Sequence, residues 1–444
     1  MGSEAIVVWV VLLTVLVSVA SGRFRFELVA LGGLFFLGIT GVAEPEKMFL
    51  GLGHPAVITI GAVFIISRGI TESGVLSGLG LFISDRVGSQ RSQILSLSAV
   101  TSVLSAFMNN VGAIGLIMPT ALRMARRSGL SKGAYGLPLA YASILGGSTT
   151  LIGSAPNIIV STSLAAATGQ GFRMFDFVPY GLIMTLSGLF LWVVCRFCGF
   201  TPGTWKEDPE LILEEASEQE KNLADQGSEQ QKKNDNDLDH PRAQPGLLLT
   251  PQRRRTVVIT GSAIAILAAG TLSPAVVFGT AALLLIILRV LSVEKAYQSL
   301  SLSILIFLGA MLGISNILEE VGGLQLLGSW LLPIWETLPR FVLLGILFFI
   351  SSFLSNILNN SASAAVMAPV ALTLGSVNAP QGDLPAMMMA VAMGANLAVI
   401  MPTHQATLMV LSRAPFSISS LMKGGIVLTL VAGTAVVAVI NLLL

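Results

Sequence analysis

The chain has 444 residues, of which 53% are hydrophobic and only 11% are charged. A soluble domain carries about 25% charged residues. Apolar runs of about 20 residues, long enough to cross a bilayer, recur along most of this sequence. The composition predicts an all-α membrane protein and argues against a soluble enzyme. The formal net charge of +1 gives no reason to expect a nucleic-acid partner.

Hydrophobic runs in both halves of the chain predict membrane spans. A mostly polar stretch at 201–255, rich in Glu, Gln, Lys, Asn and Asp, separates the halves and predicts a disordered linker. An amphipathic stretch at 74–87 is expected at the membrane interface. The expected full spans are 5–20, 26–42, 56–71 and 178–197 before the linker, and 256–269, 274–291, 304–318 and 422–444 after it.

Two asparagine pairs stand out, each in the middle of an apolar run. Asn109-Asn110 lies in SVLSAFMNNVGAIGLIMPTAL, and Asn359-Asn360 lies in SFLSNILNNSASAAVMAPVAL, at an offset of 359 − 109 = 250. An unsatisfied polar group in lipid costs on the order of several kcal/mol. The arms on either side of each pair are too short to cross separately with normal length. We therefore expect re-entrant helical hairpins at 92–127 and 340–375, with a single long tilted helix as the alternative.

Each hairpin is followed by an apolar segment that polar and helix-breaking residues interrupt. GGSTTLIGSAPN interrupts the segment 137–166, and ANLAVIMPTHQAT interrupts the segment 385–411. Such breaks are tolerated in a membrane only where they are buried or line a cavity. The same plan occurs twice, which predicts two repeats, 1–200 and 256–444, of about five transmembrane helices each.

The distribution of basic residues predicts how the repeats are oriented. Each repeat makes an odd number of crossings, so the two are expected to be inverted relative to one another. Lys and Arg are far more frequent at one set of membrane ends, such as 123–132 and 253–255, than at the other. The positive-inside rule then places the linker in the cytoplasm and both termini outside, in the plasma or inner membrane. The hairpin tips would meet near the midplane.

A half-helix that begins at a hairpin tip presents unpaired N–H groups and the positive end of its dipole, which favours an anion. Asn110, Asn360, Ser361 and Ser154 add side-chain donors at this place. Carbonyl groups near Ser105 and Ser355, the asparagine side-chain oxygens and the unwound backbone at Gly153 and Thr403 form a candidate Na⁺ cage.

Neither hairpin and neither break contains Asp or Glu, and His404 is the titratable residue there. An intramembrane histidine is a candidate proton carrier. Its alternative is a structural hydrogen-bond donor next to Gln405.

The tips, the stretches PTAL and PVAL and the break ending in IGSAPN resemble the divalent-anion:sodium symporter family, within the ion-transporter superfamily. The resemblance covers essentially the whole chain outside the linker. A branch with Asn-Asn tips carries a soluble regulatory domain between the repeats, and this linker looks like that branch with the domain missing. The resemblance implies a homodimer that works by elevator-type alternating access.

The resemblance also assigns roles to individual residues. The first cation site would use Ser105, Asn109, Asn110 and the break near Gly153; the second would use Ser355, Asn359, Asn360 and the break near Thr403. The substrate would lie between Asn110 and Asn360, with Val111, Ser154, Ser361 and His404 nearby. Val111 replaces a hydroxyl of the family pattern, and His404 replaces a small neutral residue, so the half-sites are expected to be unequal.

Three hypotheses follow from the sequence. The first is a Na⁺-coupled symporter of a small divalent anion, sulfate or a dicarboxylate, with Na⁺ as the coupling ion and lipid as the surrounding partner. The second is a proton-coupled anion carrier or exchanger that uses His404. The third, of another class, is an anion sensor with a transporter-like fold and no flux.

Overall fold

The computed structural model describes residues 2–20, 24–73, 90–108, 110–128, 131–197, 250–268, 272–323, 338–378, 383–414 and 416–444. All regular secondary structure in these residues is helical, which confirms the predicted all-α class. Before the linker, the helices are α1 (Gly2–Ala20), α2 (Phe26–Ile39), α3 (Pro45–Met48), η1 (Phe49–Gly51), α4 (Pro55–Ser73), α6 (Gln90–Phe107), α7 (Asn110–Ser128), α8 (Lys132–Gly147), α9 (Ala155–Thr168) and α10 (Val178–Phe197). After it come α13 (Pro251–Ala268), α14 (Pro274–Ile287), α15 (Val293–Ser299), α16 (Leu302–Glu320), α18 (Arg340–Ile357), α19 (Asn360–Asn378), α20 (Asp383–Asn396), α21 (Gln405–Arg413) and α22 (Ile418–Leu443).

Local sequence signals explain where several helices begin and end. Pro274 occupies the first turn of α14, where its missing N–H would have no intrahelical partner. Ser292 caps α15, because its hydroxyl accepts a bond from the Lys295 N–H. Gly169 ends α9 with a φ of 79°, a left-handed conformation that glycine adopts without strain.

Four helical segments of the described chain are long and apolar enough to cross a membrane: 45–73, 302–320, 340–357 and 418–443. The described chain also has shorter apolar helices, such as 26–39 and 274–287. The mostly apolar helices α2 and α14 bury only one face inside the protein. The exposed side of such helices is suited to lipid.

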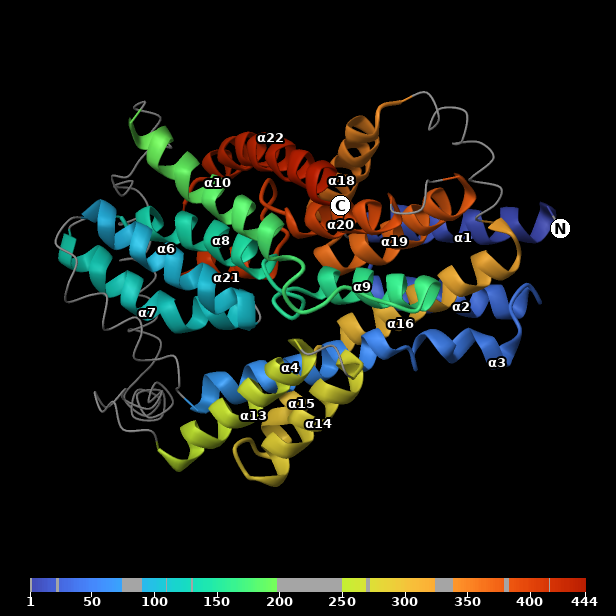
Figure 1. Ribbon diagram of the computed structural model, residues 1–444, viewed down its shortest axis with the longest axis horizontal. Coiled ribbons are helices and arrows are strands. Elements are labelled where there is room, and N and C mark those ends of the chain that lie inside the picture. Colours follow the sequence, from blue (N-terminus) through green and yellow to red (C-terminus); the bar gives the residue numbers. More distant parts are fainter. Residues whose placement is uncertain are drawn as a thin grey trace, which may run out of the picture.

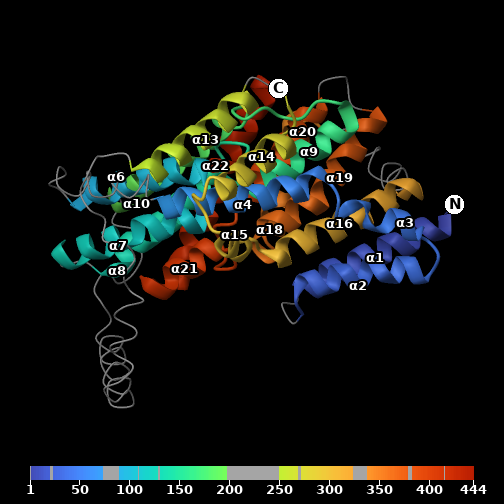
Figure 2. The same cartoon turned by 90° about the horizontal axis from the view of Figure 1, so that it is seen from below.

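The helices of the hairpins and of the broken helices pack against one another (Figures 1 and 2). The hairpin α6–α7 packs on α8, and the hairpin α18–α19 packs on α20. The second parts of the broken helices are exchanged: α9 packs on α19 and α20, whereas α21 packs on α7 and α8. One apolar core, from Val8 in α1 to Ile440 in α22, runs through both halves. The exchange brings both helix breaks and both hairpin tips to one place.

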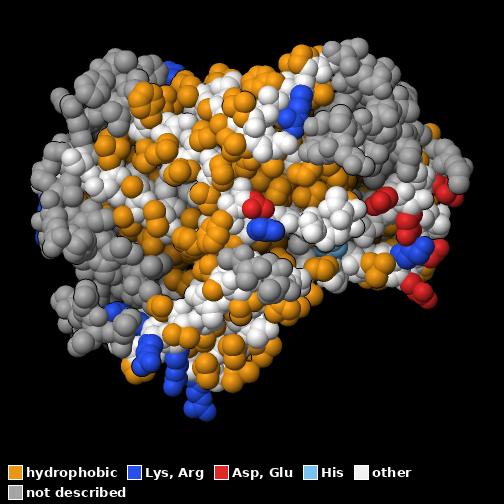
Figure 3. All heavy atoms as spheres, viewed as in Figure 1, with side chains coloured by type: hydrophobic (Ala, Val, Ile, Leu, Met, Phe, Trp, Pro, Cys, Tyr) orange, Lys and Arg blue, Asp and Glu red, His pale blue; other side chains and the backbone are white. Residues whose placement is uncertain are grey.

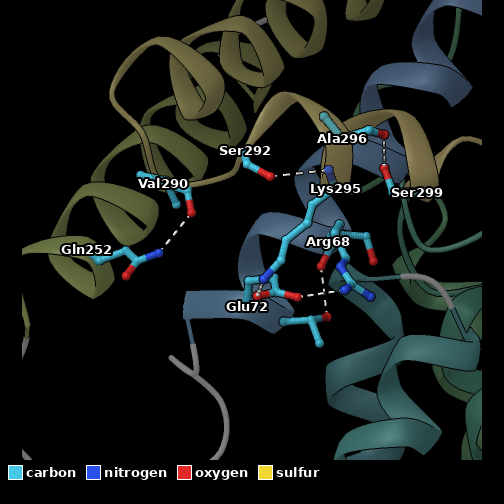
Figure 4. Close-up of polar contacts among 10 residues, drawn as sticks. Arg68, Glu72, Gln252, Val290, Ser292, Lys295, Ala296 and Ser299 are labelled. Carbon is cyan, nitrogen blue, oxygen red and sulfur yellow. Dashed lines mark hydrogen bonds and ion pairs between the residues drawn. The ribbon is translucent and has the colours of Figure 1, made fainter. Parts of the chain in front are cut away.

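A second group of helices, α1, α2, α4, α13, α14 and α16, packs beside the hairpins and broken helices, and we call it the wall group. Within the wall group α4 packs on α13 and α14, and α16 packs on α1 and α2. Helix α4 also packs on α15. Polar contacts join its end near α15 (Figure 4): Glu72 lies 2.6 Å from both Arg68 and Lys295, and the Gln252 side chain donates to the Val290 carbonyl at 2.8 Å. The Lys295–Glu72 ion pair joins α4 to the second half of the chain.

Charged side chains lie mainly at the edges of the face in Figure 3, and hydrophobic side chains cover most of its described middle. Lys and Arg gather at the lower left, over α13, which begins with Arg253-Arg254-Arg255. Acidic side chains gather at the right. Lys47 forms ion pairs with Glu44 and Glu320, at 3.2 and 3.4 Å. Charged side chains at the edges of a mostly hydrophobic face are typical of a membrane protein.

Element boundaries differ in detail from the expected ones. The helices of the predicted hairpins extend over 90–128 and 340–378, and the interrupted segments over 132–168 and 383–413. Helix α13 begins at Pro251, inside the stretch expected as linker, because the arginines there continue directly into the apolar helix. The expected interfacial stretch 74–87 and the linker residues 201–249 lie outside the described residues.

Candidate functional site

Both asparagine pairs interrupt a helix, and the interruptions are in register. Helix α6 ends at Phe107 and α18 at Ile357, and α7 begins at Asn110 and α19 at Asn360; 357 − 107 and 360 − 110 both equal 250. The Ser105 hydroxyl donates to Asn110 Oδ1 at 2.8 Å, and the Ser355 hydroxyl donates to Asn360 Oδ1 at 3.0 Å. The same buried serine–asparagine bond therefore orients the amide at each tip.

The helix breaks are held open by buried amides. In the first, the Asn157 side chain donates to the carbonyls of Ser148 (3.3 Å) and Thr150 (2.8 Å). In the second, Asn356 Oδ1 accepts from the N–H groups of Ile400 and Met401, at 2.8 and 3.1 Å. These side chains replace the intrahelical bonds that the breaks lose, which is the condition for irregular backbone inside a membrane protein.

One buried hydrogen bond joins the two breaks. Asn396 Nδ2, at the end of α20, donates to Asn157 Oδ1 at 2.6 Å. Both side chains are buried. The bond couples the first break to the second half of the chain.

The two tips and the two breaks line one cavity of about 220 Å³. Its polar side is formed by residues from α7, α9, α19, α21 and the segments that precede them: Asn110, Val111, Gly153, Ser154, Asn359, Asn360, Ser361, Thr403, His404 and Gln405. Its apolar side includes the wall-group residues Phe26, Ile60, Val63, Phe64 and Ile304 from α2, α4 and α16. No Asp, Glu, Lys or Arg is among the described residues that line it.

Four helices begin at this cavity. Asn110, Ala155, Asn360 and Gln405 are the first residues of α7, α9, α19 and α21, and all four line it. Each N-terminus carries about half a positive charge from the helix dipole. At α19 and α21 one N–H group is capped, by Asn359 and by His404. With no lining carboxylate to compensate them, the four helix ends make the cavity electropositive without a formal charge.

His404 has a defined role in this arrangement. Its Nδ1 accepts a bond from the Ala406 N–H at 3.1 Å and so caps α21. In a neutral imidazole with Nδ1 as acceptor, the proton is on Nε2. Nε2 lies 3.4 Å from Asn110 Nδ2, whose Oδ1 is taken by Ser105. Two N–H donors from opposite halves of the chain thus lie side by side at the cavity.

Oxygen atoms converge on two glycines of the first half, behind Asn110. A Cβ atom built on Gly153 would lie 2.4 Å from the Gly147 carbonyl oxygen, 2.9 Å from that of Ala106 and 3.0 Å from that of Ser105. A Cβ atom built on Gly147 would lie 2.4 Å from Asn110 Oδ1 and 3.1 Å from the Gly153 carbonyl oxygen. These five oxygens, from Ser105, Ala106, Asn110, Gly147 and Gly153, are called the oxygen cage below. Neutral oxygens of this kind suit a hard cation such as Na⁺. Two of the five already accept hydrogen bonds: the Ala106 carbonyl from the Thr150 hydroxyl, and Asn110 Oδ1 from Ser105.

Oxygens of the second half are bound within the protein as well. Thr403 Oγ1 donates to the Asn356 carbonyl at 3.0 Å. Asn359 Oδ1 accepts from the Ala362 N–H at 2.8 Å and caps α19. Ser355 and Asn360 repeat the pairing found at the first tip.

The structure thus brings most of the predicted site residues to one place, around one cavity. Ser105 and Ser355 are fully buried behind the tips and reach the cavity only through the asparagines they orient. Asn109 lies outside the described residues. Asn157, Asn356 and Asn396 were not predicted, although Asn157 ends the quoted IGSAPN stretch and Asn356 lies three residues before the second asparagine pair.

The profile of the CitMHS family, described as citrate transporter, matches residues 9–394. This chain belongs to the citrate transporter family. Over 198 residues it is 31% identical to the uncharacterized transporter YfbS of Escherichia coli (strain K12), covering 44% of this chain and 32% of YfbS. Over 206 residues it is 29% identical to sodium/sulfate cotransporter 2 of Chlamydomonas reinhardtii, covering 43% of this chain and 23% of that protein.

Among solved structures, the chain is similar to the YdaH transporter of Alcanivorax borkumensis, with 16% identity, a TM-score of 0.43 and coverage of 93% of this chain and 88% of YdaH. The stretches that match the two curated relatives span 32% and 23% of those proteins' lengths. The family match and the apolar helices long enough to cross a membrane indicate a multi-pass membrane protein.

Proposed function

We propose that this chain is a Na⁺-coupled symporter of a small divalent anion, sulfate or a dicarboxylate. The observation that carries the proposal is the convergence of four helix N-termini on one cavity without a lining carboxylate. The donors of Asn110, Asn360, Ser361 and His404 would bind the anion's oxygens. Relatives named sodium/sulfate cotransporters support both the anion and the cation.

The coupling cation would bind in the oxygen cage. Asn110 belongs to the cage through Oδ1 and lines the cavity. A cation there would fix the Asn110 side chain and add positive charge next to the anion. This contact explains physically how binding of one ion would favour binding of the other.

The two-sided lining of the cavity supports an elevator-type movement. Polar donors come from the hairpins and broken helices, and apolar residues such as Phe26 and Phe64 come from the wall group. The hairpins and broken helices could move along such an apolar surface without breaking hydrogen bonds to it. We propose that the hairpins and broken helices move as a unit past the wall group, that the repeats are inverted, and that the chain forms a homodimer, as in the divalent-anion:sodium symporters it resembles.

Binding and flux can be separated on the purified protein. We expect sulfate or a C4 dicarboxylate to raise the unfolding temperature in the presence of Na⁺, and anion-loaded proteoliposomes to show counterflow of the same labelled anion. Thermal stabilisation without counterflow would favour an anion sensor. Counterflow that a proton gradient drives and Na⁺ does not affect would favour the proton-coupled carrier.

A further inference from the structure

A second hollow lies between α13 and α14, which pack side by side (Figure 1). It has a volume of about 120 Å³ and shares no lining residue with the cavity between the tips and breaks. All of its lining residues except two are apolar: Ile259, Ser262, Ala263, Ile266, Leu272, Val276, Val277, Thr280, Ala281 and Leu284. We call this hollow the α13–α14 groove.

Basic side chains lie at one end of the α13–α14 groove. Arg255 lies one helical turn before the first groove residue of α13. Its Nη1 donates at 3.0 Å to the Leu288 carbonyl, one turn beyond the last groove residue of α14. Arg254, Arg255 and Arg289 are exposed, and none of them forms an ion pair with the part of the chain that the structure describes. Figure 3 shows Lys and Arg gathered over α13.

The beginning of α13 is electropositive for a second reason. Arginines in the first turns of a helix add to the positive end of its dipole instead of offsetting it. The bond from Gln252 to the Val290 carbonyl and the bond from Arg255 to the Leu288 carbonyl hold this end of α13 beside the end of α14. Uncompensated positive charge next to an apolar groove is complementary to an anionic head group that carries an acyl chain.

The groove also has the direction that an acyl chain needs. Its α13 residues extend from Ile259 to Ile266, about 10 Å along the helix axis at 1.5 Å per residue. The positive-inside rule puts the arginines at the cytoplasmic edge of the membrane, where anionic lipids are found. A groove that runs along α13 from that edge leads into the hydrocarbon layer.

We propose that the α13–α14 groove binds one anionic phospholipid. Arg254, Arg255 and Arg289 pair with its phosphate, and one acyl chain lies between the two helices. A phosphatidylcholine head group would bring its own cation next to the arginines, so the groove selects an anionic lipid. The lipid is not the transported ion, and its binding does not depend on the proposed function.

Native mass spectrometry of the purified full-length protein, titrated with phosphatidylglycerol or phosphatidylcholine of the same chain length, tests the head group. We expect one phosphatidylglycerol per chain, bound about tenfold or more tightly than phosphatidylcholine. Arg255→Gln/Arg289→Gln should lose this preference. Arg126→Gln/Arg127→Gln, which removes two exposed arginines from the last turn of α7, is the matched control and should keep it. Equal affinity of the wild type for both lipids, or the same loss in the control, would overturn the proposal.

Thr280→Trp tests the acyl chain, because it fills the groove without changing any charge. Thr280 is exposed, and Thr434→Trp, at an exposed threonine of α22, is the matched control. We expect only Thr280→Trp to lose phosphatidylglycerol, and we expect glycerol phosphate, which lacks acyl chains, not to displace the lipid from the wild type. Displacement by glycerol phosphate would overturn the proposal in favour of a free anion. Unchanged lipid binding in Thr280→Trp would also overturn it, and a change from dimer to monomer in that case would make the groove a subunit contact.

Discussion

At the scale of single residues, the site depends on neutral groups whose orientation is fixed by buried hydrogen bonds. Ser105 and Ser355 each take the oxygen of a tip asparagine, which leaves the amide N–H groups to donate. Hydrogen bonds to a charged group contribute about 1.5–3 kcal/mol each. A few such donors, added to the helix N-termini, would account for the proposed anion binding without a lysine or arginine among the described residues of the cavity.

The asparagines were predictable because an amide in an apolar run is costly unless it is hydrogen-bonded, so two such pairs at matched positions indicate a function. The oxygen cage was not, because it forms where α6, α7 and the first break cross. Nothing in the sequence distinguishes Gly147 and Gly153 from the other glycines. Only the oxygen atoms that lie close to them in the folded chain do so.

Replacing either tip asparagine is expected to reduce anion uptake strongly. Asn110→Ala and Asn360→Ala each remove a donor to the anion, and at 1.4 kcal/mol per factor of ten the loss is about ten- to a hundredfold. Initial uptake rates in proteoliposomes measure this, with Asn441→Ala in α22 as the matched control and reconstitution levels as the check on insertion. Wild-type uptake in either tip variant would mean that the site lies elsewhere.

His404→Gln separates an anion ligand from a proton carrier. Because Nδ1 caps α21 and Nε2 faces Asn110, we expect His404 to act as a neutral donor. The variant should therefore weaken anion binding about tenfold while the pH profile of Na⁺-driven uptake keeps its shape. Uptake measured between pH 5.5 and 8.5 decides the matter. If the variant lost a pH-dependent component that the wild type has, His404 would be a proton carrier.

At the scale of elements, the broken helices join the two halves at the cavity. Helix α9 leaves the first half to pack on α19 and α20, and α21 makes the reverse exchange. The sequence predicted that both helices break, because glycine, proline and hydroxyl residues interrupt apolar segments. The sequence did not predict the exchange of α9 and α21. The Asn157–Asn396 bond joins residues that are 239 apart, so the repeat offset of 250 gave no sign of it.

The Asn157–Asn396 bond is expected to stabilise the contact between the halves. Asn157→Ala and Asn396→Ala should each lower the unfolding free energy by about 1–3 kcal/mol, since each leaves a buried partner unsatisfied. The double variant should lose less than the sum, with a coupling of about 0.5–3 kcal/mol. Unfolding of the detergent-solubilised protein measures all three. Additive losses would show that the two amides stabilise the protein independently.

At the scale of the whole molecule, the apolar wall group and the polar hairpins divide the protein into two parts that meet at the cavity. Composition predicted a helical membrane protein, and the chain's membership of the citrate transporter family agrees. The wall residues Phe26, Phe64 and Ile304 were not predictable as a set, because apolar residues recur throughout these helices and carry no signal of what they face.

The orientation of the chain in the membrane follows from the positive-inside rule and can be measured by labelling. In a background without Cys195 and Cys198, we expect Ser3→Cys to react with an impermeant thiol reagent on intact cells. Ser228→Cys, in the linker, should react only after the membrane is opened. The reverse pattern would place the termini in the cytoplasm and exchange the sides of the two hairpins.

The central claim is that two hairpin tips and two helix breaks form one site where Na⁺ and a divalent anion bind together. Uptake of labelled sulfate and of labelled C4 dicarboxylates into proteoliposomes, with an inward Na⁺ gradient and with Na⁺ replaced by choline, tests it most directly. We predict accumulation of at least one of these anions above equilibrium with the gradient and none without it. Equal uptake of these anions in the presence and absence of Na⁺ would contradict the account.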